Sequence, residues 1–425
     1  MPTINHGAAF TGAGASFRST TSYTNGVYIL NERAIKKMDE DFAKKSYTNS
    51  AANLSNFSWA NANAITIESE GKGQINAYDF GAALGSRMGA LHEVNTERNT
   101  YQLKQVFSAR ETFEKIYSDD ALNERKLART LKTINEKLMV AVDTYRLKTW
   151  ADGAGNTFVV TSGGLAINNA SATAAALGTS NIVKILLQAN AYLDNMNVPE
   201  NGRLFFVSIT DAYTIFQLAD ELKYQQEFTN KGAINGAIRR LGKATVVAIP
   251  DSRMPAGCKV LCKWKGASAD PRKMTWTKIY PNVEGFSGPI LNGIWRYDSF
   301  ILAHKANGVL VIGDSTAAPQ TTPAMALGTS GDAGKIVITS ASADKIFYTI
   351  DGHNPKIEDN GSSVVLGGNA TSGAVKLTNP TADCYIQAYA VKAGKINSGI
   401  AKYFYRYDAS TPTLTALTYD QDIEF

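Results

Sequence analysis

The stretch from Asn197 to Ser208, Asn-Val-Pro-Glu-Asn-Gly-Arg-Leu-Phe-Phe-Val-Ser, passes from a turn into a run of large apolar residues. A second apolar run, Ala-Thr-Val-Val-Ala-Ile, covers Ala244–Ile249 and is followed by Pro250. Proline and glycine bound both runs, which is typical of short strands. Between them, about Asp211 to Leu222 has a helical pattern. This alternation of strand, helix and strand predicts an α/β subdomain.

Length and composition indicate a folded chain of several domains. A chain of 425 residues is too long to fold around one compact core, so we expect about two to three domains. Hydrophobic residues make up 44% and charged residues 19%, which excludes the composition of disordered chains. The net charge of +5 is too small for a dedicated nucleic-acid-binding protein. The first residues lack a secretory signal pattern, and no run reaches the roughly 18 apolar residues of a membrane span.

Two long helices stand out around the α/β subdomain. The first is predicted from Ala121 to Trp150, with Asp119 and Asp120 placed to cap its start. The second is predicted from about Asn181 to Met196, capped by Thr179 or Ser180. Apolar residues recur at spacings of three or four in both. The two stripes are Leu127, Leu131, Ile134, Leu138, Val142 and Tyr145, and Ile182, Ile185, Leu186, Ala189, Tyr192 and Leu193.

The other segments differ in character. Residues 1–63 are rich in small and polar residues around one predicted helix, Asn31 to Lys45, whose apolar stripe is too thin to form a core of its own. Residues 64–117 carry two strand-like runs, 64–68 and 101–107, around a glycine-rich segment, and predict an extended hairpin. Further strands are expected over 259–265, 274–280 and 294–312. Ser315 to Gly331 resembles a linker, 335–407 predicts a small β-sandwich, and 408–425 an acidic tail.

Residues with chemical potential do not form a known catalytic motif. The loop from Gly236 to Thr245 resembles a phosphate-binding P-loop, but its glycines enclose five residues and an alanine follows Lys243. In addition, the expected strand follows this loop instead of preceding it. Arg239, Arg240 and Lys243 therefore predict a basic cluster facing solvent or another subunit. No Gly-Xaa-Ser-Xaa-Gly motif is present, and capping explains the paired Asp119 and Asp120 better than glycosidase catalysis.

The sequence does not predict a metal site either. Cys258 and Cys262 lie four residues apart in an expected strand, and we interpret them and Cys384 as buried free thiols. The histidines His6, His92, His304 and His353 are scattered, and His92-Glu93 lacks the second histidine of a zinc protease. Asp351, Asn354, Asp359 and Asn360 could supply oxygen ligands to calcium, but their local sequences are typical of turns. We expect no catalytic, cofactor-binding or metal-binding residues.

Three stretches carry a resemblance to a known family. Lys-Leu-Met-Val-Ala-Val-Asp-Thr-Tyr-Arg at 137–146 resembles the end of the long spine helix of tailed-phage major capsid proteins with the Hong Kong 97-type fold. Residues 190–208 resemble the start of the axial domain in that family, and 294–305 the return to its peripheral domain. The resemblance implies an α+β fold of this type. It also implies an N-terminal arm (1–63), an extended loop (64–117), a spine helix with the start of the peripheral domain (118–160), an axial domain (161–255), a peripheral return (256–314), a linker (315–329), a β-sandwich (330–408) and a tail (409–425).

A second resemblance covers the C-terminal sandwich. Tyr-Thr-Ile-Asp-Gly-His-Asn-Pro at 348–355 and the stretch 388–398 look like the immunoglobulin-like module at the C-termini of chitobiase-type enzymes. On a coat protein this module would be an outward decoration, or it would adhere to surface glycans. A cell-surface or carbohydrate-binding protein is therefore the alternative hypothesis. A nucleotide-dependent enzyme using the loop near Lys243 ranks last.

The capsid resemblance also implies partners and a location. It implies a homo-oligomer of hexamers and pentamers that closes into an icosahedral shell in the virion, after assembly in the host cytoplasm. Portal, scaffold or decoration proteins would bind it, and packaged double-stranded DNA would make weak, sequence-independent contacts. Some relatives join subunits through a lysine-to-asparagine bond. No motif for that bond surrounds Lys72, so the chemistry is not carried over.

Overall fold

The structure is a computed structural model of the 425-residue chain. It divides into two compact units, residues 1–43 and 44–425, and the description below concerns the second. The residues described are 46–53, 64–70, 78–81, 83, 86–88, 96–112, 123–221, 241–280, 290–357, 365–367 and 374–417.

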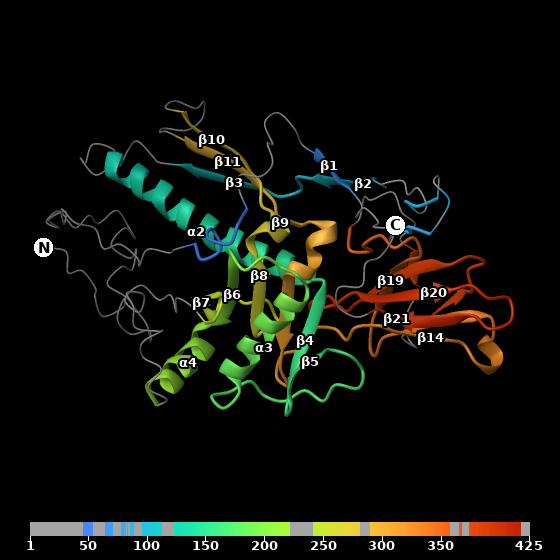
Figure 1. The fold of residues 1–425 in the computed structure, drawn as a ribbon. Coiled ribbons are helices and arrows are strands. Elements are labelled where there is room, and N and C mark those ends of the chain that lie inside the picture. The colour runs from blue at the N-terminus through green and yellow to red at the C-terminus, as the bar shows by residue number, and fades with distance from the viewer. Residues whose placement is uncertain are drawn as a thin grey trace, which may run out of the picture. The chain divides into compact units, whose positions relative to one another are not determined.

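A mixed six-stranded sheet, here called the central sheet, lies at the centre of this unit (Figure 1). Its strand order is β5-β4-β13-β8-β6-β7. The pairs β6–β7 and β4–β13 are parallel, and the other neighbours are antiparallel. The strands are β4 (Asn156–Thr161), β5 (Gly164–Ile167), β6 (Arg203–Ser208), β7 (Thr245–Ile249), β8 (Val260–Trp264) and β13 (Val309–Gly313).

Both faces of the central sheet are covered, as the uninterrupted apolar runs predict. Successive side chains of a strand point to opposite faces, so Phe205 and Val207 of β6 enter one core while Leu204 and Phe206 enter the other. Helices α3 (Ile182–Asn195) and α4 (Ile209–Glu221) contribute to the first core. Helix α2 (Asn123–Asp152) contributes to the second. The predicted strand–helix–strand unit is therefore correct.

Helix α3 confirms the predicted apolar stripe, since all six of its residues are buried. The predicted cap is wrong, because the N-cap is Asn181, whose side-chain oxygen accepts a hydrogen bond from the N–H of Gly178. The helix ends through Asn197, whose positive φ of 53° suits the left-handed end of a helix. Helix α4 begins at Ile209, two residues before the predicted start.

Helix α2 has the predicted length, but its deepest face differs from the predicted stripe. Ile134, Leu138, Val142 and Tyr145 are half-buried. The side chains of Leu127 and Leu131, and both aspartates expected to cap the helix, lie outside the described residues. The fully buried face consists of Asp143, Arg146, Leu147, Trp150 and Ala151. Asp143 and Arg146 are charged, so a search for apolar residues at helical spacing does not find this face.

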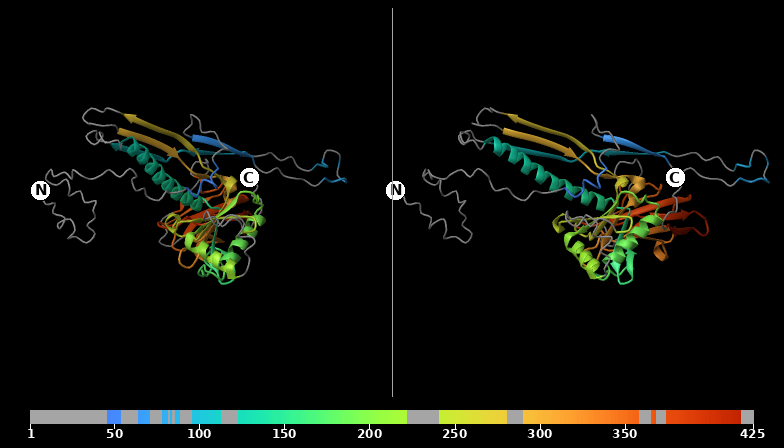
Figure 2. Two further views of the ribbon diagram at one scale, coloured as in Figure 1. Left: turned by 90° about the vertical axis from the view of Figure 1, so that its left-hand side faces the viewer. Right: turned by 60° about the vertical axis from the view of Figure 1, so that its left-hand side comes forward.

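A second sheet lies alongside α2, as both views of Figure 2 show. Its order is β10-β11-β3, with β10 Arg272–Tyr280, β11 Ile290–Tyr297 and β3 Val106–Thr112. Tyr145 of α2 meets Tyr297 edge to face at 5.7 Å between ring centroids. Strands β1 (Ala64–Glu70) and β2 (Thr96–Gln102) form an antiparallel pair, as the hairpin prediction requires. The expected strand over 101–107 is divided into β2 and β3.

The expected strand over 294–312 is also wrong as a single element. It contains the end of β11, the short β12 (Phe300–Ile301), the 3-10 helix η6 (Ala303–Gly308) and β13. Strand β12 pairs with β9 (Ser268–Ala269). The other short helices of this region are η4 (Asp251–Arg253) and η5 (Lys265–Ala267).

Two antiparallel sheets form the C-terminal unit, residues 324–417. One is β14-β15-β18 and the other β17-β16-β19-β20-β21, and buried residues of both share one core. The predicted linker and tail each contain a strand, because β14 pairs with β15 and β21 pairs with β20. The bounds are β14 Ala324–Leu327, η7 Ser330–Asp332, β15 Lys335–Thr339, β16 Lys345–Thr349, β17 Val365–Gly367, β18 Ala374–Thr378, β19 Cys384–Val391, β20 Ala401–Arg406 and β21 Thr413–Ala416.

The central sheet draws strands from several of the expected domains. The boundaries expected after residues 160 and 255 both run through it, because β4, β8 and β13 pair within the same sheet as β6 and β7. Sequence order alone does not reveal such long-range pairing. Among the described helices, none is both long and apolar enough to span a bilayer.

Candidate functional site

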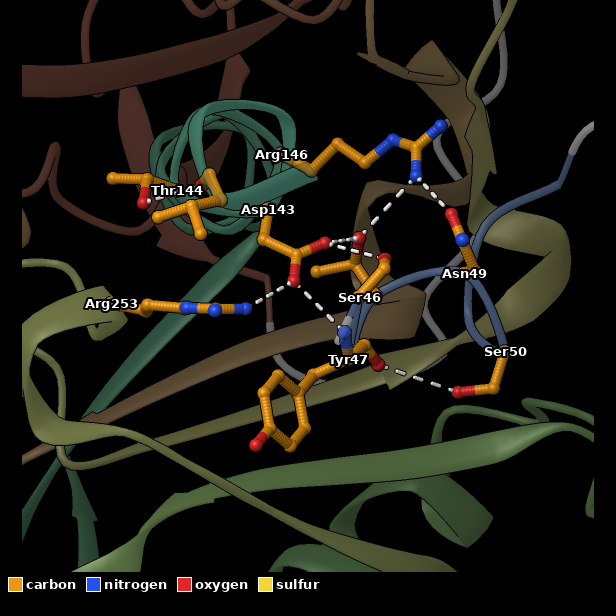
Figure 3. Close-up of polar contacts among 10 residues, drawn as sticks. Ser46, Tyr47, Asn49, Ser50, Asp143, Thr144, Arg146 and Arg253 are labelled. Atoms are coloured by element: carbon orange, nitrogen blue, oxygen red, sulfur yellow. Dashed lines mark hydrogen bonds and ion pairs between the residues drawn. The ribbon is translucent and has the colours of Figure 1, made fainter. Parts of the chain in front are cut away.

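A short segment, residues 46–53, crosses the last turns of α2 and is called the strap below (Figure 3). Its main partner is Asp143, whose side chain is completely buried. Ser46 Oγ and Thr48 Oγ1 donate hydrogen bonds to Asp143 Oδ1 at 2.8 and 2.6 Å. The backbone N–H of Tyr47 donates to Oδ2 at 2.8 Å. Three consecutive strap residues therefore bind one carboxylate.

Two arginines complete this cluster. Arg253 of η4 donates through Nη1 to Asp143 Oδ2 at 2.8 Å and lies 5.0 Å from the centre of the Tyr47 ring. Arg146, one helical turn after Asp143, donates to Thr48 Oγ1 at 3.3 Å and Asn49 Oδ1 at 2.9 Å. A buried charge costs several kcal/mol unless it is paired and hydrogen-bonded. Without the strap, Asp143 would keep Arg253 but lose three donors.

A second buried carboxylate, Asp270, holds the other end of the strap. The N–H of Asn53 donates to Asp270 Oδ2 at 2.9 Å, and the N–H of Asp270 donates back to the carbonyl of Asn53 at 3.0 Å. Trp150 Nε1 and Ser299 Oγ donate to Oδ1, at 3.0 and 2.5 Å. Ser268 donates to Oδ2 at 2.5 Å. This carboxylate therefore joins the strap to α2 and to the segments around β9 and β12.

Lys263 of β8 supplies the cation beneath the strap. Its Nζ donates to the carbonyl of Ala51 at 2.6 Å and lies 4.1 Å from the centre of the Trp150 ring. Asp270 Oδ2 is 4.0 Å away. Burial lowers the pKa of Lys263 to about 8, against the attraction of Asp270. Lys263 thus joins the strap, through Ala51, to Trp150 of α2 and to Asp270.

The groups at this site are suited to binding a chain segment. Both carboxylates accept hydrogen bonds from several donors of the protein itself. In the part of the chain that the structure describes, no three His, Cys, Asp or Glu side chains gather in a way that could hold a metal ion. Sequence reasoning missed Asp143, Arg146, Lys263 and Asp270. The available signal was a charged residue at a core-facing position of a helix or strand.

The residues that the sequence analysis considered are placed elsewhere. Lys243 pairs with Asp194 at 3.3 Å and with Glu200. Its hydrogen bond to Glu200 is the larger cause that raises the pKa of Lys243, and its hydrogen bond to Asp194 adds to this. Strand β7 follows it, as expected. Arg239 and Arg240 lie outside the described residues, so the predicted basic cluster stays a prediction. The same is true of His6, Lys72, His92, Glu93, Asp359 and Asn360.

Asp351 and Asn354 occupy turn positions. Asp351 Oδ1 accepts the N–H of His353 at 3.2 Å, and Asn354 Oδ1 accepts the N–H of Lys356 at 2.9 Å. All three cysteines are free, as predicted. Cys258 and Cys262 are buried, and burial raises the pKa of both thiols.

An exposed apolar group lies in the segment between β1 and β2. Tyr78, Phe80 and Met88 expose 51%, 82% and 79% of their surfaces. The rings of Tyr78 and Phe80 meet edge to face at 4.9 Å, and the N–H of Asp79 donates to the carbonyl of Arg87 at 3.1 Å. We call Tyr78, Phe80 and Met88 the loop tip. Large apolar side chains gathered at one exposed site are characteristic of interaction surfaces.

The comparison with solved structures finds matches, whereas the two comparisons of sequence find none. No family model and no curated protein sequence matches this chain. The capsid structure of the cyanophage P-SCSP1u matches with a TM-score of 0.52 and 12% identity, over 67% of this chain and 93% of that chain. The chain has the fold of a phage capsid protein.

Two further matches to this capsid fold are weaker. A structure from Mycobacterium phage Che8 has a TM-score of 0.49 and 13% identity, over 67% of this chain and 97% of that chain. The mature capsid of bacteriophage PhiM1 has a TM-score of 0.47 and 14% identity, over 72% of this chain and 97% of that chain. At such identities the cyanophage match establishes a shared capsid fold and leaves function to be argued from the molecule.

Proposed function

We propose that this chain is the major capsid protein of a tailed double-stranded DNA phage. Copies would assemble as hexamers and pentamers into the icosahedral head of the virion and enclose the genome. The observation that carries this proposal is the match to the cyanophage capsid, which extends over 93% of that chain. A fold shared over nearly a whole coat subunit supports the same structural role, and it supports assembly over catalysis.

The expected divisions of a Hong Kong 97-type subunit fit the observed elements in part. We propose that helix α2 is the spine helix, that the β10-β11-β3 sheet belongs to the peripheral domain and that the β1–β2 pair is the base of the extended loop. The axial domain would comprise α3, α4 and the strands beside them. We propose the strap as part of the N-terminal arm expected over residues 1–63.

The loop tip supports assembly on physical grounds. Phe80 and Met88 are more exposed than any other large apolar side chain among the described residues. Leaving such groups in water is unfavourable by about 25 cal/mol per Å² of apolar surface. Burial against a neighbouring copy would remove that cost. Obligate interfaces of this kind often bury more than about 2,000 Å² in total.

Assembly of the purified full chain tests the proposal. We expect closed particles by negative-stain electron microscopy and a fast-sedimenting species by analytical ultracentrifugation, with or without a co-expressed scaffold protein. The double variant Phe80→Ser, Met88→Ser should remain folded but sediment mainly as small oligomers, because the loop tip would lose its apolar contact. The matched control is Tyr407→Ser, which removes a 45% exposed aromatic ring of the C-terminal unit and should assemble normally.

Two different outcomes would contradict the coat function and the role of the loop tip. Monomers alone at high protein concentration, under conditions in which the chain is folded, would exclude a coat function. Particles formed equally well by the loop-tip double variant would keep the function and exclude the role of the loop tip. Portal, scaffold or decoration proteins and packaged DNA are the proposed partners of the assembled shell.

The C-terminal unit gives a second candidate function. We propose an immunoglobulin-like decoration that adheres to glycans. One cross-strand aromatic pair on its larger sheet supports this: the rings of Tyr385 and Phe404 meet at 4.9 Å, and both side chains are half-buried. Aromatic faces can stack on sugar rings as they do on other apolar surfaces. Glycan-array binding by the full chain, lost in Tyr385→Ala and kept in Tyr407→Ala, would support it; no binding would exclude it.

A further inference from the structure

The C-terminal unit contacts the end of α2 at an unusual point. The last carbonyls of a helix have no partner within the helix and must find one outside it. Lys356, from the segment after β16, donates through Nζ to the carbonyls of Asp152 and Ala154 at 2.9 and 2.6 Å. A lysine is well suited to the negative end of a helix. The end of α2 is therefore satisfied by a residue about 200 positions further along the chain.

A second loop of the C-terminal unit reinforces this contact. The N–H of Asn397, between β19 and β20, donates to Asp152 Oδ1 at 3.2 Å. The N–H of Ile400 donates to the carbonyl of Gly155 at 2.8 Å, and that of Gly399 to Thr157 Oγ1 at 2.9 Å. Residues from Asp152 to Thr157, which link α2 to β4, are thus held by backbone groups of the C-terminal unit.

Apolar packing accompanies these polar contacts. Ile396 of the same loop is only 2% exposed and belongs to the core between α2 and the central sheet, together with Leu147 and Trp150. It is not part of the C-terminal unit's own core. Full burial of such a side chain removes a large apolar surface from water and is favourable. The contact is therefore energetically substantial.

Further hydrogen bonds hold the C-terminal part of the chain against the rest, and a cavity lies beside them. Asn354 donates through Nδ2 to the carbonyl of Ala303 at 3.0 Å, and the N–H of Thr322 donates to the carbonyl of Asn168 at 2.7 Å. A cavity of about 360 Å³ lies beside Lys356, bordered by Thr149 of α2 and Tyr389 of the C-terminal unit. Burial also lowers the pKa of Lys356 to about 7, despite the attraction of Asp152. The contact of Lys356 with the end of α2 is thus partly shielded from water.

We infer that the C-terminal unit is a clamp that holds the end of α2 and thereby stabilises the site where the strap binds. The strap binds α2 through Asp143 and packs near Trp150, and the clamp binds the same helix from Asp152 onward. The two contacts lie within about 13 Å along the helix, at 1.5 Å per residue. Loosening the clamp therefore loosens the strap, because both depend on one rigid helix end.

Amide hydrogen exchange of the full, unassembled chain tests this inference. In Lys356→Met we expect exchange to rise by about tenfold or more at Gly155 and Ile400, and also at Tyr47 in the strap. The control Lys345→Met removes an exposed lysine of the same unit and should change neither. Exchange in α4, remote from the joint, serves as an internal reference.

Two patterns of hydrogen exchange would contradict this inference. Faster exchange at Ile400 with unchanged exchange at Tyr47 would show that the unit detaches without affecting the strap, and would overturn the coupling. Unchanged exchange at both sites would overturn the clamp. If Lys356→Met does not fold, Asn354→Ala removes the milder contact to Ala303 and is judged by the same two amides. Both readouts come from single subunits and are independent of whether particles form.

Discussion

Asp143 is the residue on which the attachment of the strap depends most. It combines full burial, an ion pair with Arg253 and three donors from the strap. Removing one partner from a buried ion pair leaves the other charge uncompensated, at a cost of about 3–5 kcal/mol. We expect Asp143→Ala to lower the free energy of unfolding by about that amount, as measured by denaturant titration.

Glu136 is the matched control for this change. It lies two turns earlier on α2 and is only half-buried. Glu136→Gln should change the free energy of unfolding by less than about 0.5 kcal/mol. If Asp143→Ala were as mild as Glu136→Gln, the strap would not depend on the buried carboxylate.

Lys263 predicts how stability depends on pH. Its pKa is about 8 in the folded chain, below the value of 10.5 expected when it is exposed. The unfolded state therefore binds more protons between these two values, and stability rises with pH across that window. This contribution is fully present above pH 10.5 and is lost as the pH falls to about 8.

Comparison with a variant isolates this effect. The free energy of unfolding of the natural chain minus that of Lys263→Met should increase from pH 8 to pH 10, because methionine does not titrate. A flat difference for Lys263→Met would show that the lysine is not desolvated in the folded chain.

Adjacent leucines on α3 test the apolar stripe at the level of the element. Leu186 is completely buried, whereas Leu187 exposes 46% of its surface. Leu186→Ala should cost about 2–5 kcal/mol through lost contacts and a cavity. Leu187→Ala should cost less than about 0.5 kcal/mol. Thermal and denaturant unfolding of the pair would measure both, and equal costs would contradict the helix orientation.

Elements with strong periodicity were predictable from sequence, and those fixed by distant partners were not. The stripe of α3 and the runs of β6 and β7 are local patterns, so their burial follows from spacing alone. Strand β14 was assigned to a linker because its short run Ala-Met-Ala-Leu has a partner only in β15. The run 294–312 was expected to be one strand, although Asp298 and Ser299 interrupt it with buried polar contacts.

The candidate site was less predictable than the fold. Asp143 and Asp270 are 127 positions apart in the chain, and because most carboxylates are exposed, neither is marked as buried by its sequence. Their burial depends on donors supplied by strap residues with unremarkable sequences, such as Ser46 and Asn53. A single sequence contains no signal that brings such groups together. Only the capsid resemblance pointed to the stretch 137–146, and it did so without a role for the aspartate.

At the scale of the whole molecule, the clamp predicts one cooperative unfolding transition for residues 44–425. Ile396→Ala should lower the free energy of unfolding by about 2–5 kcal/mol, although Ile396 belongs to a loop of the C-terminal unit. The control Ile350→Ala alters a 41% exposed isoleucine of the same unit and should have little effect. Two separate calorimetric transitions, with only one shifted by Ile396→Ala, would contradict this.

The three unpaired thiols differ in how well the fold shields them. Cys262 lies within β8 of the central sheet and Cys258 just before it, and both are buried, whereas Cys384 is only partly covered, at the start of β19. A thiol-reactive reagent should therefore modify Cys384 first, and the other two only when the sheet itself opens. The order of alkylation, followed by mass spectrometry, would then show whether the C-terminal unit or the central sheet opens first.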